Sequence, residues 1–130
     1  MSDRKRVLLV DDDPQLLSCF ERLLENRFEL DIASGPGMAL EFIETRGPYA
    51  VVVSDLRMPG MSGIELLWKT KQISPQTVGV LMSGSVESDT IAHSIDKGIA
   101  FRFIEKPCVP TELIQVIEQA LTHYETYGKA

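Results

Sequence analysis

The sequence predicts an α/β fold built on a doubly wound parallel sheet of five strands, and three observations predict it. Short β-branched runs alternate with helical patterns along the chain, as in a sheet whose crossover connections are helices. Three of these runs are almost continuously apolar, which is typical of strands covered on both faces. The chain has 130 residues and contains no linker, repeat or low-complexity segment. We therefore expect a single domain over residues 1–130.

The first two βα units lie in the N-terminal part of the chain. The apolar run Val7–Val10 predicts a strand, and apolar residues at helical spacing predict a helix from Pro14 to about Asn26. Asp13 is suited to cap that helix, because Asp at the N-cap and Pro at the first helical position both favour a helix start. The second unit consists of a strand over Phe28–Ala33 and a helix from about Gly37 to Arg46.

The remaining three units follow the same alternation. The predicted strands are Ala50–Ser54, Thr77–Met82 and Phe101–Ile104. The predicted helices cover about Gly63–Gln72, about Val86–Lys97, and Pro110 onward, where apolar side chains share one helical face. Five such units most often form an open, doubly wound sheet, and we expect the flavodoxin-like strand order 2-1-3-4-5. Ligands then bind beyond the carboxyl ends of the first and third strands, where the strand order reverses.

Composition and charge argue against several classes of protein. The net charge of −6 argues against a nucleic-acid surface, and no apolar stretch approaches the roughly 18 residues of a membrane span. The two cysteines, Cys19 and Cys108, form neither a disulfide framework nor a metal-ligand pair. We expect both to be reduced, buried or half-buried thiols in a cytosolic protein. We also expect Trp68 to pack, and His93 and His123 to be solvated.

Carboxylates gather where the first and third predicted strands end. Asp11, Asp12 and Asp13 follow the first strand, and Asp55 follows the third. Carboxylates that converge on one crevice repel one another, and the arrangement makes sense if a hard cation such as Mg²⁺ holds them. A carboxylate can also act as a nucleophile and form an acyl phosphate.

Two more residues complete a site of this kind. Ser83 ends the fourth predicted strand and can donate its hydroxyl to a phosphoryl oxygen. Lys106 follows the fifth strand and supplies a positive charge. The sequence therefore predicts a phosphoryl-transfer site at one edge of the sheet.

Four motifs, all in order, resemble those of receiver domains from the response regulators of bacterial two-component systems, and the resemblance covers about residues 5–122. They are an acidic strand end, a phosphoacceptor loop with Met-Pro-Gly, a hydroxyl before a small residue, and a Lys-Pro pair. The motifs are Val7-Leu8-Leu9-Val10-Asp11-Asp12-Asp13-Pro14, Ser54-Asp55-Leu56-Arg57-Met58-Pro59-Gly60-Met61-Ser62-Gly63, Met82-Ser83-Gly84 and Glu105-Lys106-Pro107.

The resemblance implies roles for the residues around the acceptor. Asp55 would accept the phosphoryl group. Mg²⁺ or Mn²⁺ would be bound by Asp12, Asp55 and the backbone carbonyl of Arg57, with Asp11 in support. The side chains of Arg57 and Ser85 would set the lifetime of the phosphorylated state, because each lies two residues beyond a site residue.

The resemblance also implies how the signal leaves the site. Ser83 and Lys106 would hold the phosphoryl oxygens, and Ser83 together with Phe103 would switch the domain between two states. The Lys106–Pro107 bond would be cis. The face made by the fourth helix, the fifth strand and the last helix would change, and it would pair with a partner or with a second copy as a homodimer.

Partners follow from the same resemblance. A sensor histidine kinase or phosphotransfer protein would supply the phosphoryl group in the cytoplasm, and a downstream effector domain or protein would receive the signal. No direct contact with nucleic acid or membrane is expected, and residues 123–130 would begin a linker to an output domain. The stretch from Asp96 to Pro107 resembles a subgroup often fused to HD-type phosphodiesterase or other signalling output domains, although Cys108 replaces its usual Trp.

Three other functions fit the sequence less well. A haloacid-dehalogenase-like phosphatase needs a second acid two residues after its aspartyl nucleophile, and Arg57 occupies that position. A flavodoxin-like FMN binder needs a hydroxyl- and Gly-rich loop after the first strand, where three aspartates would repel the phosphate. An inert receiver is excluded because every acidic and Lys position is present. The predicted protein is no conventional enzyme, since it catalyses only its own aspartyl phosphorylation and dephosphorylation.

Overall fold

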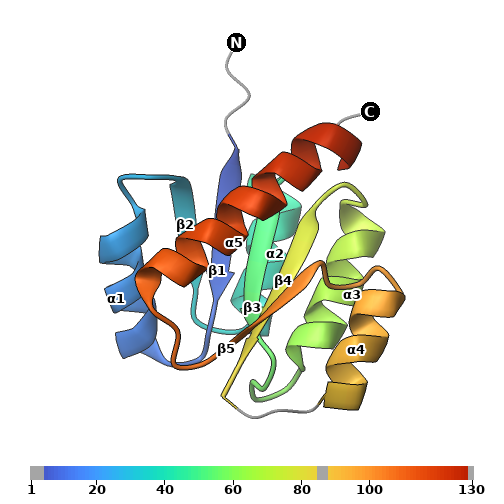
Figure 1. The fold of residues 1–130 in the computed structure, drawn as a ribbon, viewed down its shortest axis with the longest axis horizontal. Helices are drawn as coiled ribbons and strands as arrows, with labels where there is room; N and C mark the ends of the chain where they lie inside the picture. The colour runs from blue at the N-terminus through green and yellow to red at the C-terminus, as the bar shows by residue number, and fades with distance from the viewer. Residues whose placement is uncertain (1–4, 85–87, 129–130) are drawn as a thin grey trace.

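The computed structural model describes residues 5–84 and 88–128. Within these residues five strands and five α-helices alternate, and the strands form one parallel sheet of order β2-β1-β3-β4-β5 (Figure 1). The strands are β1 (Arg6–Val10), β2 (Glu29–Ala33), β3 (Val51–Asp55), β4 (Val78–Ser83) and β5 (Arg102–Glu105). The helices are α1 (Pro14–Leu24), α2 (Pro36–Arg46), α3 (Gly63–Ile73), α4 (Ser88–Asp96) and α5 (Pro110–His123), and a short π-helix, η1 (Tyr124–Gly128), continues α5.

The predicted fold class and strand order are confirmed, and the main difference lies at the strand ends. The last three strands begin and end one residue later than predicted, so Asp55 and Ser83 are the final residues of β3 and β4. Both still belong to the ladder, because Asp55 is in register with Met82, and Ser83 with Glu105. The predicted start of the fourth helix at Val86 lies outside the described residues.

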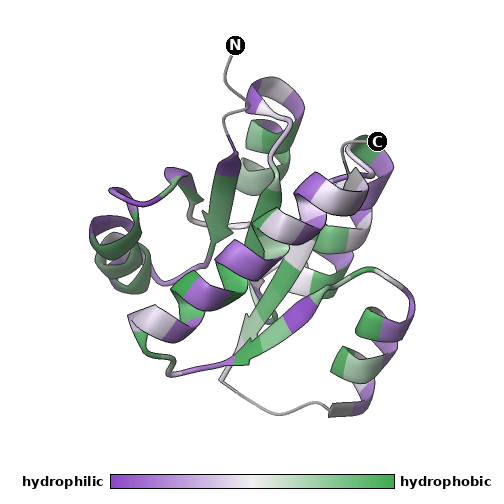
Figure 2. Ribbon diagram, turned by 45° about the horizontal axis from the view of Figure 1, so that its top comes forward, coloured by the Kyte–Doolittle hydropathy of each residue, from purple (hydrophilic) through white to green (hydrophobic). Residues whose placement is uncertain are grey.

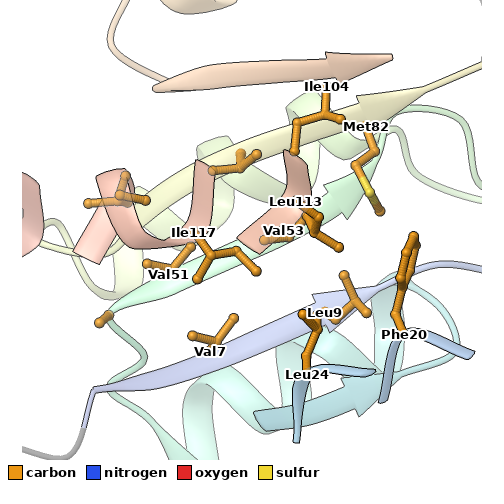
Figure 3. Close-up of a cluster of buried hydrophobic side chains, with 14 of the residues drawn as sticks. Val7, Leu9, Phe20, Leu24, Val51, Val53, Met82, Ile104, Leu113 and Ile117 are labelled. Carbon is orange, nitrogen blue, oxygen red and sulfur yellow. The ribbon is translucent and has the colours of Figure 1, made fainter. Parts of the chain in front are cut away.

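One face of the sheet is covered by α1 and α5. Side chains alternate between the two faces along each strand, so Val7 and Leu9 of β1 point to this face. Figure 3 shows how these residues pack with side chains from α1 and α5. The buried residues labelled there are Val7, Leu9, Phe20, Leu24, Val51, Val53, Met82, Ile104, Leu113 and Ile117.

The other face is covered by α2, α3 and α4. Leu8 and Val10 of β1 point to this face and belong to a second cluster of buried side chains. Figure 2 shows that the central strands are largely hydrophobic, whereas the helices alternate between hydrophobic and hydrophilic residues. Among the described side chains of α4 only Ile91 and Ser94 are buried, so this helix is more lightly attached than α1, α2, α3 and α5. No helix in the described part of the chain is long and apolar enough to cross a membrane.

Side-chain caps fix the starts of two helices that follow the site strands. Asp13 is the N-cap of α1, as predicted, and its carboxylate accepts hydrogen bonds from the backbone amides of Gln15 and Leu16 at 3.0 and 3.3 Å. Ser62 caps α3 by accepting a hydrogen bond from the Glu65 amide at 3.1 Å. Each cap satisfies a backbone amide that has no partner inside its helix.

Two side chains lie on the opposite face of their helices from the one predicted. Cys19 is exposed on α1, because Leu17 and Phe20 occupy the inner face of that helix. Trp68 is 51% exposed on α3, where Leu66 and Leu67 fill the corresponding buried positions. The predictions of a buried Cys19 and a packed Trp68 were therefore wrong. Cys108 is half-buried, as predicted.

The C-terminal end of α5 packs against the start of β5. The imidazole of His123 lies 4.7 Å from the Phe101 ring and 4.9 Å from the Tyr127 ring, measured between centroids. His123 is half-buried rather than solvated, which corrects its prediction, whereas His93 is exposed as predicted. The Lys106–Pro107 peptide bond is cis, as the resemblance implied, and so is Gly47–Pro48.

Candidate functional site

The candidate site lies at the edge of the sheet where the strands end, at the bottom of Figure 1. Asp55 and Ser83 end β3 and β4, Asp11 directly follows β1, and Lys106 directly follows β5. Parallel strands bring their carboxyl ends to one edge, and in this strand order β1 and β3 are neighbours. Four segments that are distant in the sequence therefore meet there.

Three carboxylates form the centre of the site. Oxygen atoms of Asp11, Asp12 and Asp55 all lie within 4.8 Å of one another. Asp11 and Asp55 are buried, with 1% and 8% of their surface exposed, whereas Asp12 is exposed. Asp13 has a different role, since its carboxylate caps α1. The structure thus brings together the three aspartates that the sequence assigned to a metal site.

Lys106 lies across the crevice from β1 and contacts both buried carboxylates. Its ammonium donates a hydrogen bond to Asp11 Oδ2 at 2.6 Å and lies 3.4 Å from Asp55 Oδ1. The second oxygen of Asp11, Oδ1, accepts a hydrogen bond from the Asp13 amide at 2.9 Å. The sequence had assigned Lys106 to phosphoryl oxygens alone, and its ion pair with Asp11 was missed. This ion pair joins residues that are 95 positions apart in the sequence, so no local motif reveals it.

The charges of the site shift the pKa values of Asp55 and Lys106. Burial and the neighbouring Asp11 charge raise the pKa of the Asp55 carboxyl, and Lys106 only partly offsets them. Burial by itself lowers the pKa of the Lys106 ammonium, but the hydrogen bond and charge of Asp11, together with Asp55, outweigh it and raise the pKa. Asp11 contributes to both shifts, because the single Lys106 ammonium faces more than one carboxylate at this edge of the sheet.

The donor set of the acidic cluster fits a hard cation. It consists of carboxylate oxygens, the ligands that Mg²⁺ prefers. One member, Asp12, faces solvent, so an ion that retains several water molecules can reach the cluster. A divalent cation would also offset the excess negative charge that raises the pKa of Asp55.

The backbone around Asp55 is held by close contacts. The Asp55 carbonyl accepts a hydrogen bond from the Ser54 hydroxyl at 2.9 Å. The first residue of α3 is Gly63, where a Cβ atom would lie 2.2 Å from that same carbonyl oxygen. Only glycine allows this approach of α3 to the end of β3. Gly60 in the same loop has φ +89°, which also favours glycine. Both glycines belong to the motif identified in the sequence, but the close approach and the positive φ that require glycine were not predicted.

The remaining predicted residues lie around this centre. Ser83 is 2% exposed at the end of β4. Phe103 is half-buried in β5, in register with Leu81, and packs against the cluster on the α2–α3–α4 face. Arg57 is exposed in the loop that follows β3. Ser85, assigned by resemblance to the lifetime of the phosphorylated state, lies outside the described residues.

Comparisons with known proteins agree with this geometry. Residues 7–118 match a family model described as the response regulator receiver domain. The hydrogenase transcriptional regulatory protein HoxA of Cupriavidus necator is 32% identical over 122 residues, which cover 93% of this chain and 25% of HoxA. The chain thus spans about a quarter of the length of this curated relative.

Solved structures of receiver domains also superpose on this chain. A CheY-like response regulator receiver domain protein from Methanospirillum hungatei superposes with a TM-score of 0.87 at 31% identity, covering 95% of this chain and 98% of that one. The signal receiver domain of an HD domain-containing protein from Pseudomonas fluorescens superposes with a TM-score of 0.86 at 29% identity, covering 97% and 93%.

Proposed function

The chain belongs to the response regulator receiver domain family and is a phosphorylation-dependent signalling switch, and from this premise we propose that Asp55 accepts the phosphoryl group. One observation carries the proposal: Asp55 is a buried carboxylate that lies within 4.8 Å of two others and 3.4 Å from the Lys106 ammonium. A carboxylate oxygen of Asp55 attacks the phosphorus, and the bond from phosphorus to the donor breaks as the acyl phosphate forms.

Ser83 and Lys106 hold the transferred group in this proposal. The Lys106 ammonium already lies between Asp11 and Asp55, so a small change of its side chain brings it to a phosphoryl oxygen. Ser83 ends the neighbouring strand β4 and donates its hydroxyl to another phosphoryl oxygen. Both contacts exist only when the group is present, so they stabilise the phosphorylated state selectively.

Asp11, Asp12, Asp55 and the backbone carbonyl of Arg57 hold Mg²⁺ or Mn²⁺ in this proposal. When bound, such an ion would supply positive charge beside the phosphoryl group. Asp12 contributes the exposed carboxylate, and Asp11 keeps its geometry through the Asp13 amide and Lys106. The domain thereby catalyses its own aspartyl phosphorylation and dephosphorylation and turns over no separate substrate.

The decisive experiment is mass spectrometry after incubation with acetyl phosphate and Mg²⁺. We expect one phosphoryl group on the wild-type chain and none on Asp55→Asn. Asp13→Asn is the matched control, because it also removes a carboxylate from the acidic edge while an amide side chain can still cap α1. Labelling of Asp55→Asn at the wild-type level would contradict the assignment.

The signal reaches an effector through the face of α4, β5 and α5. Receiver domains interact with histidine kinases and output domains, and here a sensor histidine kinase or a phosphotransfer protein supplies the phosphoryl group in the cytoplasm. HoxA, a transcriptional regulatory protein, is about four times as long as the region matched here, which supports control of another domain or protein. The α4–β5–α5 face also forms a homodimer on activation. A haloacid-dehalogenase phosphatase has no support from the family match.

A further inference from the structure

A pocket opens at the edge of the sheet opposite the acidic cluster. It has a volume of about 620 Å³, within the range of roughly 300–1,000 Å³ that is common for small-molecule sites. Its walls come from the end of α3, the start of β4, the segment between α4 and β5, and the end of α5 with η1, near the top of Figure 1. Gly79 lines it and precedes Ser83 by four residues in β4, which corresponds to roughly 13 Å.

One wall carries a cation without an acidic partner. Lys71 is half-buried, and its ammonium donates hydrogen bonds to the backbone carbonyls of Thr77 at 3.1 Å and Pro75 at 3.4 Å. Among the described residues no carboxylate forms an ion pair with it. Burial lowers the pKa of this ammonium, because desolvation disfavours the charged form. An anion next to Lys71 would stabilise the charged form of the ammonium.

Another wall carries aromatic rings. Phe101, His123 and Tyr127 form a row with centroid distances of 4.7 and 4.9 Å, and all three line the pocket. Tyr127 is 71% exposed, so much of its ring is available to a ligand. Ile95 adds an aliphatic surface that is 39% exposed. A flat ring can pack against these aromatic side chains by offset or edge-to-face contact.

We propose that this pocket is a second ligand site, and that it takes a small planar aromatic anion whose ring packs on His123 and Tyr127 and whose negative group reaches Lys71. The net charge of the chain is −6, so affinity for an anion must come from a local cation such as Lys71. No residue of the acidic cluster lines the pocket, so occupancy does not compete with phosphoryl transfer at Asp55.

A rival site for the same chemistry lies beside the acidic cluster. A pocket of about 410 Å³ is lined by residues including Leu16, Phe20, Cys108 and Lys106. It also combines apolar side chains with a cation. However, the Lys106 ammonium is already paired with Asp11 and Asp55, whereas Lys71 has neutral carbonyl partners. A bound anion therefore gains more electrostatic energy from Lys71 than from Lys106.

The test is an amide NMR titration of the chain with 2-naphthalenesulfonate, a planar aromatic anion. We expect shifts at Gly79, Gly98 and Phe101. Lys71→Gln should weaken binding by at least about tenfold, because it removes a charge-assisted hydrogen bond in a partly dry site. Lys69→Gln is the matched control: it makes the same change on the same helix, does not line the pocket, and should leave the affinity unchanged.

Tyr127→Ala provides a second variant, because this exposed side chain of η1 can be truncated without disturbing the core. It should also weaken binding, and the spectrum without ligand shows directly whether each variant is folded. Shifts at Leu16, Phe20 and Cys108 in place of the expected residues would overturn the proposal. So would equal affinity of Lys71→Gln and wild type, or no binding at millimolar probe.

Discussion

At the scale of single residues, two adjacent aspartates differ in what they contact. Asp12 belongs to the acidic cluster, whereas the Asp13 carboxylate is used by the backbone amides of α1. Asp12→Ala should weaken Mg²⁺ binding by well over about tenfold, because it removes a direct carboxylate ligand. Asp13→Ala should retain phosphorylation and lose about 0.5–2 kcal/mol of unfolding free energy, the usual contribution of a cap. Mg²⁺ titration and urea unfolding measure the two effects, and exchanged phenotypes would mean that the roles are reversed.

The buried carboxyl of Asp55 makes stability depend on pH. Its pKa is raised in the folded protein, so the folded state holds the proton more tightly than the unfolded chain. The resulting stabilisation is complete below the ordinary carboxyl value of about 4 and is lost as the pH rises through the raised folded value. Without Mg²⁺, Asp55→Asn should therefore be more stable than wild type at neutral pH. The difference in urea midpoint should shrink toward acid pH, and a difference that grew instead would argue against a raised pKa of Asp55 in the folded state.

At the scale of elements, a polar cluster joins the edge strand β2 to its neighbours. The Tyr49 hydroxyl donates to Asp31 Oδ2 at 2.6 Å, and Arg6 donates to the same oxygen at 3.0 Å. Arg6 also lies over the Tyr49 ring, 4.8 Å from its centroid. Burial and Asp31 raise the pKa of the Tyr49 hydroxyl, so it remains a donor at every ordinary pH.

Removing the Tyr49 hydroxyl should loosen β2. We expect Tyr49→Phe to cost about 0.5–1.5 kcal/mol of unfolding free energy, the typical net value of a hydrogen bond, because the ring itself stays packed. Tyr124→Phe is the control, since that half-buried ring makes no hydroxyl hydrogen bond to the described residues. Urea unfolding compares the two, and an equal loss in both variants would mean that the Asp31 contact contributes nothing.

The helix α4 is held against the sheet by few buried side chains. Its buried side chains in the described part of the helix are Ile91 and Ser94, and a pocket of about 320 Å³ lies between it and α3. Phe103 of β5 is half-buried on the same face of the sheet. Beryllofluoride, which mimics the phosphoryl group on Asp55, should therefore shift amide NMR signals of α4, β5 and α5. Changes confined to the acidic cluster, with residues 88–121 unaffected, would refute the coupling.

At the scale of the whole molecule, the sequence predicts the fold well because its signals are local and repeated. Apolar runs mark the strands, and alternation of runs with helical patterns implies the parallel sheet. The acidic site follows from topology, since Asp11 and Asp55 must meet once β1 and β3 are neighbours. The one-residue shift at β3 and β4 arises because ladder pairing continues through Asp55 and Ser83, which hydropathy assigned to loops or strand ends.

What the sequence missed depends on contacts between distant segments. The row of Phe101, His123 and Tyr127 forms only when α5 crosses the start of β5. The Asp31 cluster draws on residues from β1, β2 and the turn before β3. Cys19 was misplaced because several residues of α1 are compatible with an inner position, and packing against the sheet chose Leu17 and Phe20. Hydropathy and spacing do not encode these choices.

The order of the strands also determines how the domain behaves in a crowded solution. The two outer strands, β2 and β5, have unpaired backbone groups along one side, and such strands can recruit other chains and aggregate. Both are short, with 5 and 4 residues, and both carry charges: Glu29 and Asp31 on β2, Arg102 and Glu105 on β5. Extending the sheet would bring these charges against an incoming strand and strip their water. The short, charged edge strands therefore oppose the joining of sheets from neighbouring copies of the domain into fibrils.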